Sequence, residues 1–161
     1  MDKSKITKTN AARVLEAAKI HFELRTYEVV GEHQSALDVA NAIGVRPEMI
    51  YKTLVLKGQK DPFLVAVIPS DANLDLKKIA KASGNKNCEM LPMKDLLSTT
   101  GYIRGGCSPI GMKKQFPTYI EEMATLEEQI IISAGKKGLQ LVISPANLQN
   151  TIEAIFADLV S

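Results

Sequence analysis

The sequence predicts an α+β domain in which helices flank a mixed, curved β-sheet. Helical and strand-like segments intermingle along the chain without the regular strand–helix–strand rhythm of a parallel sheet. No internal repeat, low-complexity tract or linker divides the 161 residues, so we expect a single domain over residues 1–161. The composition, 45% hydrophobic and 24% charged, is that of a globular protein with enough apolar residues to form a core.

The first third of the chain predicts a helix, a strand and a second helix. Residues 9–18 repeat apolar side chains at helical spacing. Residues 22–29 alternate apolar and polar side chains, as a half-buried strand does. Residues 35–43 return to helical spacing, and we expect this helix to begin at a capping Ser35 and end at Gly44.

The middle of the chain predicts a hairpin followed by two short helices. Residues 51–56 and 63–68 are rich in valine, leucine and aromatic residues, and a glycine- and proline-containing turn separates them. Residues 75–82 follow with helical spacing and end at Gly84, a typical helix stop. Residues 94–98 form the second predicted helix.

The last third predicts short strands and a terminal helix. We expect strands around Tyr102, around Tyr119 and over residues 129–132, and a further strand over 139–143. Ser144 and Pro145 are typical of a helix start, and the predicted helix runs to about Leu159. Its expected core-facing residues are Leu148, Ile152, Ile155 and Phe156.

The segment 101–111 is the strongest candidate for a functional loop. Four glycines and a proline in eleven residues exclude a regular helix or a central strand. Arg104 lies inside the segment, and Lys113 and Lys114 follow it. Exposed backbone N–H groups beside positive charge suit a phosphate, a carboxylate or an oxyanion. A plain glycine-rich turn between two strands is the alternative.

Lys52 is the most unusual residue of the predicted hairpin. In an alternating strand it shares a face with Leu54 and Leu56, while Tyr51 and Thr53 lie on the other face. A lysine among leucines is expected to bind an anion or to be partly desolvated. The alternative is a lysine whose aliphatic stem covers apolar surface and whose ammonium reaches water.

Several catalytic chemistries lack their residues. His21 and His33 lie near the N-terminus without a carboxylate-rich or cysteine-rich partner segment, so a histidine-based metal site lacks ligands at usable spacing. No GxSxG motif supports a serine nucleophile. Cys88 and Cys107 belong to no CxxC pattern, so we expect reduced, unpaired thiols. We therefore expect no metal and no other cofactor. The absence of an apolar signal core or membrane span predicts a cytoplasmic protein without a membrane partner.

Positive charge is concentrated in the middle of the chain. Residues 77–114 carry eight basic residues against Glu89 and Asp95, a local net charge of +6, whereas the whole chain carries only +2. Such a cluster favours encounter with a polyanion. The alternative is that these are ordinary solvent-exposed lysines on helix surfaces.

Five segments, taken together and in order, resemble the YbaK/EbsC family of editing deacylases, which is related to the editing domain of bacterial prolyl-tRNA synthetases. The matching segments are residues 51–55, 71–78, 100–102, 105–114 and 133–139. The resemblance implies a barrel-like sheet and hydrolysis of mischarged Cys-tRNA(Pro), beside prolyl-tRNA synthetase in a transient ternary complex. It also implies that Cys107 is a small packing residue and not a nucleophile.

The resemblance assigns roles to individual residues. Lys52, Gly105 and Gly106 correspond to catalytic positions, where the lysine orients the ester or the tRNA 3′ end and the glycine amides face the aminoacyl carbonyl. The expected substrate-binding residues are Tyr27, His33, Ser108 and Ser133. The expected tRNA-binding residues are Lys77, Lys78, Arg104, Lys113 and Lys114.

Two other functions stay open at this point. One is a non-catalytic module that docks tRNA or a synthetase through the same basic surface. The other is a hydrolase of alanyl- or prolyl-tRNA, because residues 27–34 depart most from the family pattern. The family mechanism uses the thiol of the substrate cysteine as the nucleophile, which fits a chain poor in acid–base groups.

Overall fold

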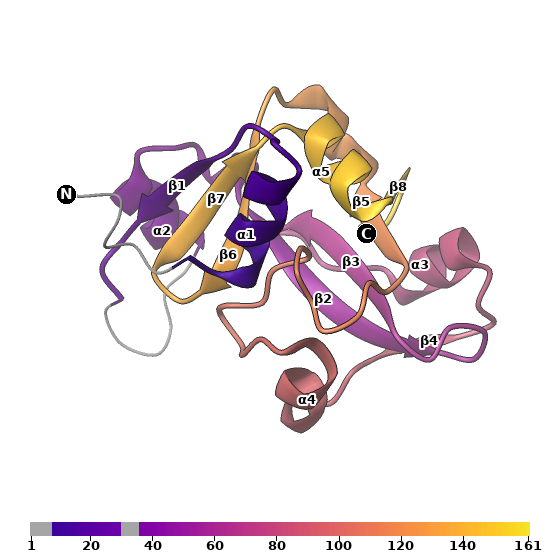
Figure 1. Ribbon diagram of the computed structural model, residues 1–161. Helices are drawn as coiled ribbons and strands as arrows, with labels where there is room; N and C mark the ends of the chain where they lie inside the picture. The colour runs from indigo at the N-terminus through magenta and orange to yellow at the C-terminus, as the bar shows by residue number, and fades with distance from the viewer. Residues whose placement is uncertain (1–7, 30–35) are drawn as a thin grey trace.

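The computed structural model describes residues 8–29 and 36–161, and their strands form two hydrogen-bonded sheets (Figure 1). The first sheet is antiparallel, in the order β1-β7-β6, and consists of β1 (Glu23–Thr26), β6 (Ile130–Lys136) and β7 (Leu139–Ile143). The second sheet has the order β4-β2-β3-β5-β8. Its strands are β2 (Tyr51–Gly58), β3 (Leu64–Pro69), β4 (Cys88–Met90), β5 (Thr118–Glu121) and β8 (Ile155–Ala157).

The second sheet is mixed, because β2 pairs antiparallel with β3 and β4, whereas β5 pairs parallel with β3 and β8. The predicted α+β class and the mixed sheet are therefore confirmed. The predicted hairpin is the β2–β3 pair, in which Lys52 lies opposite Ile68.

Helices α1, α3 and α5 begin at side-chain caps. The Thr9 hydroxyl accepts a hydrogen bond from the Ala12 N–H, the Asp75 carboxylate from the Lys77 and Lys78 N–H groups, and the Ser144 hydroxyl from the Asn147 N–H. The α-helices are α1 (Asn10–Ala17), α2 (Ala36–Ile43), α3 (Leu76–Ser83), α4 (Leu96–Thr100) and α5 (Pro145–Ile152). The 3₁₀ helices are η2 (Pro47–Met49), η3 (Met93–Asp95) and η4 (Glu122–Leu126). The predicted cap Ser35 lies outside the described residues.

Side-chain alternation along β6 separates two apolar layers. Ile130 and Ile132 are fully buried in the largest core cluster together with Leu15 of α1. Ile131 points to the opposite face and packs with Ala40 of α2. Helices α1 and α2 therefore cover opposite faces of the three-stranded sheet (Figure 1).

The same alternation makes β3 a central strand that is buried on both faces. Val65 and Val67 belong to the core cluster shared with the three-stranded sheet. Ala66 and Ile68 face the other way and pack with Ile79 of α3. All six residues of β3 are buried, which explains its uninterrupted apolar sequence.

The two sheets meet at the start of β2. Ile50, directly before β2, forms an isolated parallel bridge with Ile131 of β6. The Ile50 carbonyl also accepts a hydrogen bond of 2.8 Å from the Ser70 N–H, just after β3. This junction places the first residues of β2 beside the β6–β7 hairpin.

Two sequence-based predictions of secondary structure are wrong. Tyr102 lies in irregular backbone after α4, where its hydroxyl donates a 2.7 Å hydrogen bond to the Ile110 carbonyl. The predicted helix 144–159 ends at Ile152, because Glu153 adopts a left-handed conformation with φ 51°. Residues 155–157 then form β8 beside β5, and Ile155 is 56% exposed instead of facing the core.

Candidate active site

A pocket of about 350 Å³ lies at the junction of the two sheets. Its walls come from the segment after β1, from α2, from the start of β2, from the loop after α4 and from the β6–β7 hairpin. Four residues predicted from the sequence line it together: Tyr27, Lys52, Gly105 and Ser133. The fold therefore unites site residues that lie far apart in the sequence.

Lys52 is half-buried and lines the pocket. Within residues 8–29 and 36–161, no carboxylate forms an ion pair with it. Lys57, farther along the same strand, lies 3.9 Å from the Glu89 carboxylate instead. The Lys52 ammonium is thus available to an anionic or strongly polar part of a ligand.

In the glycine loop, residues 101–111, Gly105 lines the pocket and Gly106 does not. The Gly106 N–H donates a 3.0 Å hydrogen bond to the Ile103 carbonyl, and Gly105, with φ +82°, occupies the third position of this turn. Gly105 lines the pocket, whereas Gly106 is buried outside its lining. Among the described residues nothing accepts a hydrogen bond from the Gly105 N–H. Of the two glycine N–H groups expected to face a ligand, only that of Gly105 is therefore available at the pocket.

Close backbone approach holds this loop against the β6–β7 hairpin. A Cβ atom on Gly106 would lie 3.1 Å from the Lys137 backbone nitrogen and 3.2 Å from the Lys136 Cα. A Cβ atom on Gly135 would lie 2.7 Å from the Tyr102 ring. The Gly135 contact requires glycine, and at Gly106 a Cβ atom fits only if the neighbouring backbone shifts by a few tenths of an ångström. Together the two contacts fix the position of Gly105 relative to the hairpin.

The two predicted serines have different environments. Ser133 lines the pocket, and its hydroxyl accepts a 3.1 Å hydrogen bond from the Gly135 N–H. Ser108 is fully buried, and its hydroxyl accepts a 3.3 Å hydrogen bond from the Ile110 N–H. Ser108 does not line the pocket, so its position supports a role inside the loop and not the predicted contact with substrate.

Cys107 lines the pocket and is buried. Burial raises the pKa of its thiol to about 11, and a hydrogen bond with Thr100 opposes this shift only in part. The pKa of the half-buried Cys88 is raised for the same reason. Neither thiol has the low pKa of a reactive cysteine.

The predicted tRNA-binding residues form two groups. Arg104, Lys113 and Lys114 are exposed on and beside the glycine loop, and the Lys113 ammonium also donates a 3.3 Å hydrogen bond to the Ser98 carbonyl. Lys77 lines a second hollow of about 290 Å³ that shares no residue with the pocket.

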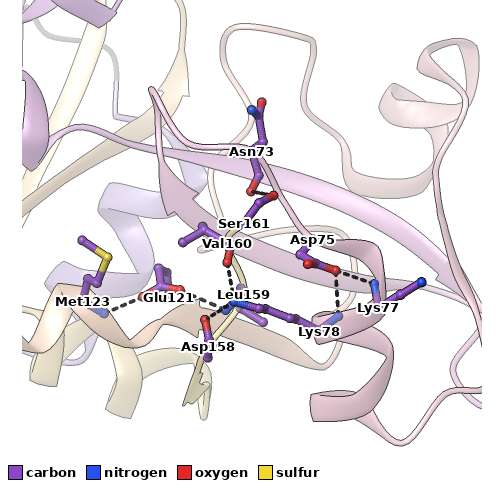
Figure 2. A network of polar contacts seen from close by, with 10 residues as sticks. All are labelled: Asn73, Asp75, Lys77, Lys78, Glu121, Met123, Asp158, Leu159, Val160 and Ser161. Atoms are coloured by element: carbon purple, nitrogen blue, oxygen red, sulfur yellow. Dashed lines mark hydrogen bonds and ion pairs between the residues drawn. The ribbon is translucent and has the colours of Figure 1, made fainter.

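Lys78 belongs to the contacts that hold the end of the described chain (Figure 2). Its ammonium lies 3.0 Å from the Asp158 carboxylate and 2.7 Å from the Val160 carbonyl. The hydrogen bond with Asp158 raises the pKa of Lys78, and its ammonium is already paired with a carboxylate. A structural role therefore fits Lys78 better than the predicted phosphate contact.

The pocket is also lined by residues that were not among the predicted site residues. Thr53, Lys137 and Gln140 line it, as does Tyr51. Burial, reinforced by nearby carboxylates, raises the pKa of Tyr51 to about 12, so its hydroxyl stays protonated. A glutamine inside the apolar run 139–143 was a usable signal for Gln140, because an uncompensated polar residue in a buried strand is uncommon.

His33 lies outside the described residues. Within the part of the chain that the structure describes, no group of three or more His, Cys, Asp or Glu side chains could hold a metal ion. No helix of that part has the length and apolar character needed to cross a bilayer.

Comparison with known proteins defines the class. Residues 31–151 match the family model of the aminoacyl-tRNA editing domain. An Enterococcus faecalis protein named "Putative Cys-tRNA(Pro)/Cys-tRNA(Cys) deacylase EbsC" is 50% identical over 154 residues, which cover 96% of this chain and 94% of that protein. The chain therefore belongs to the aminoacyl-tRNA editing domain family.

The chain also matches part of a synthetase and the fold of a solved structure. A proline–tRNA ligase of Thermosipho africanus is 32% identical over 76 residues, which cover 47% of this chain and 13% of the ligase. A crystal structure described as "a putative trans-editing enzyme for prolyl tRNA synthetase" superposes with a TM-score of 0.82 at 23% identity, over 96% of this chain and 99% of that one. The fold is shared with that protein.

Proposed function

We propose that this chain is a trans-editing deacylase that cleaves the aminoacyl ester of mischarged Cys-tRNA(Pro), with Cys-tRNA(Cys) as a second substrate. The observation that carries the proposal is the pocket that gathers Lys52, Gly105 and Ser133 at one junction of the fold. The name of the 50% identical relative supports the substrate. The match to part of a proline–tRNA ligase supports a transient complex with prolyl-tRNA synthetase. The family of aminoacyl-tRNA editing domains supports a location in the cytoplasm.

The proposed reaction uses the thiol of the substrate cysteine. The sulfur attacks the ester carbonyl carbon, the C–S bond forms, and the C–O bond to the terminal ribose breaks. The ribose hydroxyl leaves with the proton that the thiol gives up, and water later hydrolyses the cyclic thioester to cysteine. The protein must orient the ester and stabilise the oxyanion, and a lysine and a backbone amide can do both.

The four pocket residues predicted from the sequence have places in this reaction. Lys52 orients the ester or the tRNA 3′ end, and the Gly105 N–H donates to the developing oxyanion. Tyr27 and Ser133 contact the aminoacyl moiety. Arg104, Lys113 and Lys114, exposed around the same loop, bind phosphates of the acceptor end.

The test is deacylation of Cys-tRNA(Pro) by wild-type protein and by Lys52→Ala. Loss of an orienting or oxyanion-stabilising cation is expected to lower kcat/KM roughly 100- to 1,000-fold. Lys57→Ala is the matched control, because Lys57 lies on the same strand but outside the pocket. Unchanged turnover by Lys52→Ala would refute the assignment of Lys52, and tRNA binding without turnover by the wild type would indicate a docking module.

The same assay with Ala-tRNA(Pro) and Pro-tRNA(Pro) tests the nucleophile. A reaction that depends on the substrate thiol leaves both of these esters intact while Cys-tRNA(Pro) is cleaved. Equal rates for cysteinyl and alanyl esters would instead show that water attacks the ester.

A further inference from the structure

Two polar side chains in the pocket have no partner in the described part of the chain. The Thr53 hydroxyl oxygen is buried and forms no hydrogen bond there. Gln140 as a residue is only 7% exposed, and its side-chain amide, which is not fully enclosed, forms no hydrogen bond within that part of the chain. Both residues line the pocket. Because buried polar groups in folded proteins are almost always paired, a buried unpaired hydroxyl that shares a cavity with an unpaired amide points to a missing ligand.

These two groups come from different sheets. Thr53 is the third residue of β2, in the five-stranded sheet. Gln140 lies on β7 in the three-stranded sheet, where it is the cross-strand partner of Ser133. Gly105 and Lys137 line the same pocket but are exposed. The unpaired groups therefore occupy its enclosed part, and the exposed residues form its mouth.

The size of the substrate decides which of its parts can reach the enclosed groups. The tRNA ribose and phosphates are bulky and charged, so they must stay at the mouth near the Lys137 ammonium. The aminoacyl moiety is the part that can enter. Apart from the ester, the hydrogen-bonding group common to aminoacyl moieties is the α-amino group. Hydroxyl and amide oxygens both accept hydrogen bonds from an amine or ammonium.

We infer that Thr53 and Gln140 form a subsite that binds the α-amino group of the aminoacyl ester. The ammonium groups of the two pocket lysines, Lys52 and Lys137, cannot accept hydrogen bonds. Thr53 and Gln140 can, so they hold the amine away from the lysines and orient the ester towards Gly105. The inference rests on the proposed deacylase function and adds to it two residues that determine specificity.

The experiment compares two esters that differ only in the α-amino group, cysteinyl-tRNA(Pro) and 3-mercaptopropionyl-tRNA(Pro). Both carry the thiol. Wild-type protein is expected to cleave the cysteinyl ester with a kcat/KM roughly 10- to 100-fold higher, the usual effect of leaving buried polar groups unpaired. Gln140→Met, which keeps the length of the side chain and removes its acceptor, should abolish most of this preference by slowing only the cysteinyl ester. Gln140→Glu, which keeps an acceptor, should retain the preference.

Thr53→Val supplies a second readout. Removal of an unpartnered buried hydroxyl should raise the Tm of the free protein while it weakens the preference for the cysteinyl ester. A purely structural role would not produce this opposite pair of effects. Gln115→Met is the control, because Gln115 is exposed and lies outside the pocket.

The possible outcomes separate the two proposals. Cleavage of both esters by the wild type at equal kcat/KM would overturn the subsite alone, without recourse to any variant. Equal slowing of both esters by Gln140→Met would overturn it as well. If the wild type cleaved neither ester, the deacylase function itself would fail, and the subsite with it.

Discussion

Cys107 lies in the pocket, yet its surroundings keep its thiol protonated. It is 8% exposed, and burial raises its pKa to about 11, above the ordinary value of 9. Thiolate is the reactive form of cysteine, so at neutral pH only a very small fraction of Cys107 can react. The expectation that Cys107 is a packing residue agrees with this environment.

Alkylation measures the thiol directly. In a Cys88→Ser background, iodoacetamide should modify Cys107 slowly at pH 7 and progressively faster as the pH approaches 11, as followed by mass spectrometry. Cys107→Ala should keep kcat/KM for Cys-tRNA(Pro) within a few-fold of wild type. Rapid modification at pH 7 together with loss of turnover in Cys107→Ala would identify a nucleophile instead.

Lys52 and Gln140 show what a sequence can and cannot indicate about a single residue. A lysine on a strand face with leucines is expected to bind an anion, which makes Lys52 a candidate site residue, and the structure places it in the pocket. Gln140 gave a similar signal in its apolar strand, but nothing in the sequence shows that its amide lacks a partner. Whether a polar group is paired depends on residues that are distant in sequence.

The glycine loop and the β6–β7 hairpin form one structural unit. The backbone of Gly106 packs against that of Lys136 and Lys137, where no side chain can move aside. A Cβ atom at residue 106 would therefore force the loop and the hairpin apart by a few tenths of an ångström and shift Gly105 with the loop.

Gly106→Ala tests this contact. The added methyl group should push the loop away from the hairpin, lowering the free energy of unfolding by about 1–3 kcal/mol and kcat/KM roughly 10-fold. Urea denaturation and the deacylation assay measure the two effects. Gly44→Ala is the control, because its φ of +73° also disfavours alanine but no atom lies within 4 Å of the new Cβ. It should lose stability and keep its activity, and a Gly106→Ala protein that behaved in the same way would contradict the positioning role.

At the scale of elements, local signals predicted the β2–β3 hairpin and the starts of α1, α3 and α5. Caps and alternation act over a few residues, so they can be recognised in a sequence. The end of α5 could not be predicted in this way. Residues 155–157 extend because the edge of β5 offers them backbone partners.

Across the whole molecule, the last described residues tie α3 to β5 (Figure 2). The Glu121 carboxylate, buried at the end of β5, accepts hydrogen bonds from the Met123 N–H at 2.7 Å and from the Leu159 N–H at 2.9 Å. The Leu159 carbonyl in turn accepts from the Asp75 N–H at the start of α3. Glu121 thus has a structural role, because it joins the end of β5 to the segment that contacts α3. That residues 1–161 form a single domain stays a prediction.

Glu121→Gln tests this connection with almost no change in shape. Glutamine offers one acceptor oxygen, so its NH₂ group must face one of the two N–H donors. We expect the free energy of unfolding to fall by about 2–3 kcal/mol, as measured by urea denaturation, with kcat/KM unchanged at a temperature where the variant is folded. Glu122→Gln, at the exposed neighbouring position, should be neutral. Equal stability of the two variants would show that the buried carboxylate is dispensable.

The α+β class, most helix starts, the central hairpin and the resemblance to an editing domain could be predicted from the amino-acid sequence, because they depend on contacts within a few residues or on ordered motifs. The division of the strands into two sheets, the use of the Gly106 amide within its own turn and the contact of Lys78 with Val160 became visible only in the folded chain. Folding alone brings Thr53 and Gln140 into one cavity. The physical reason is that hydrogen-bond pairing and enclosure depend on which distant segments pack together.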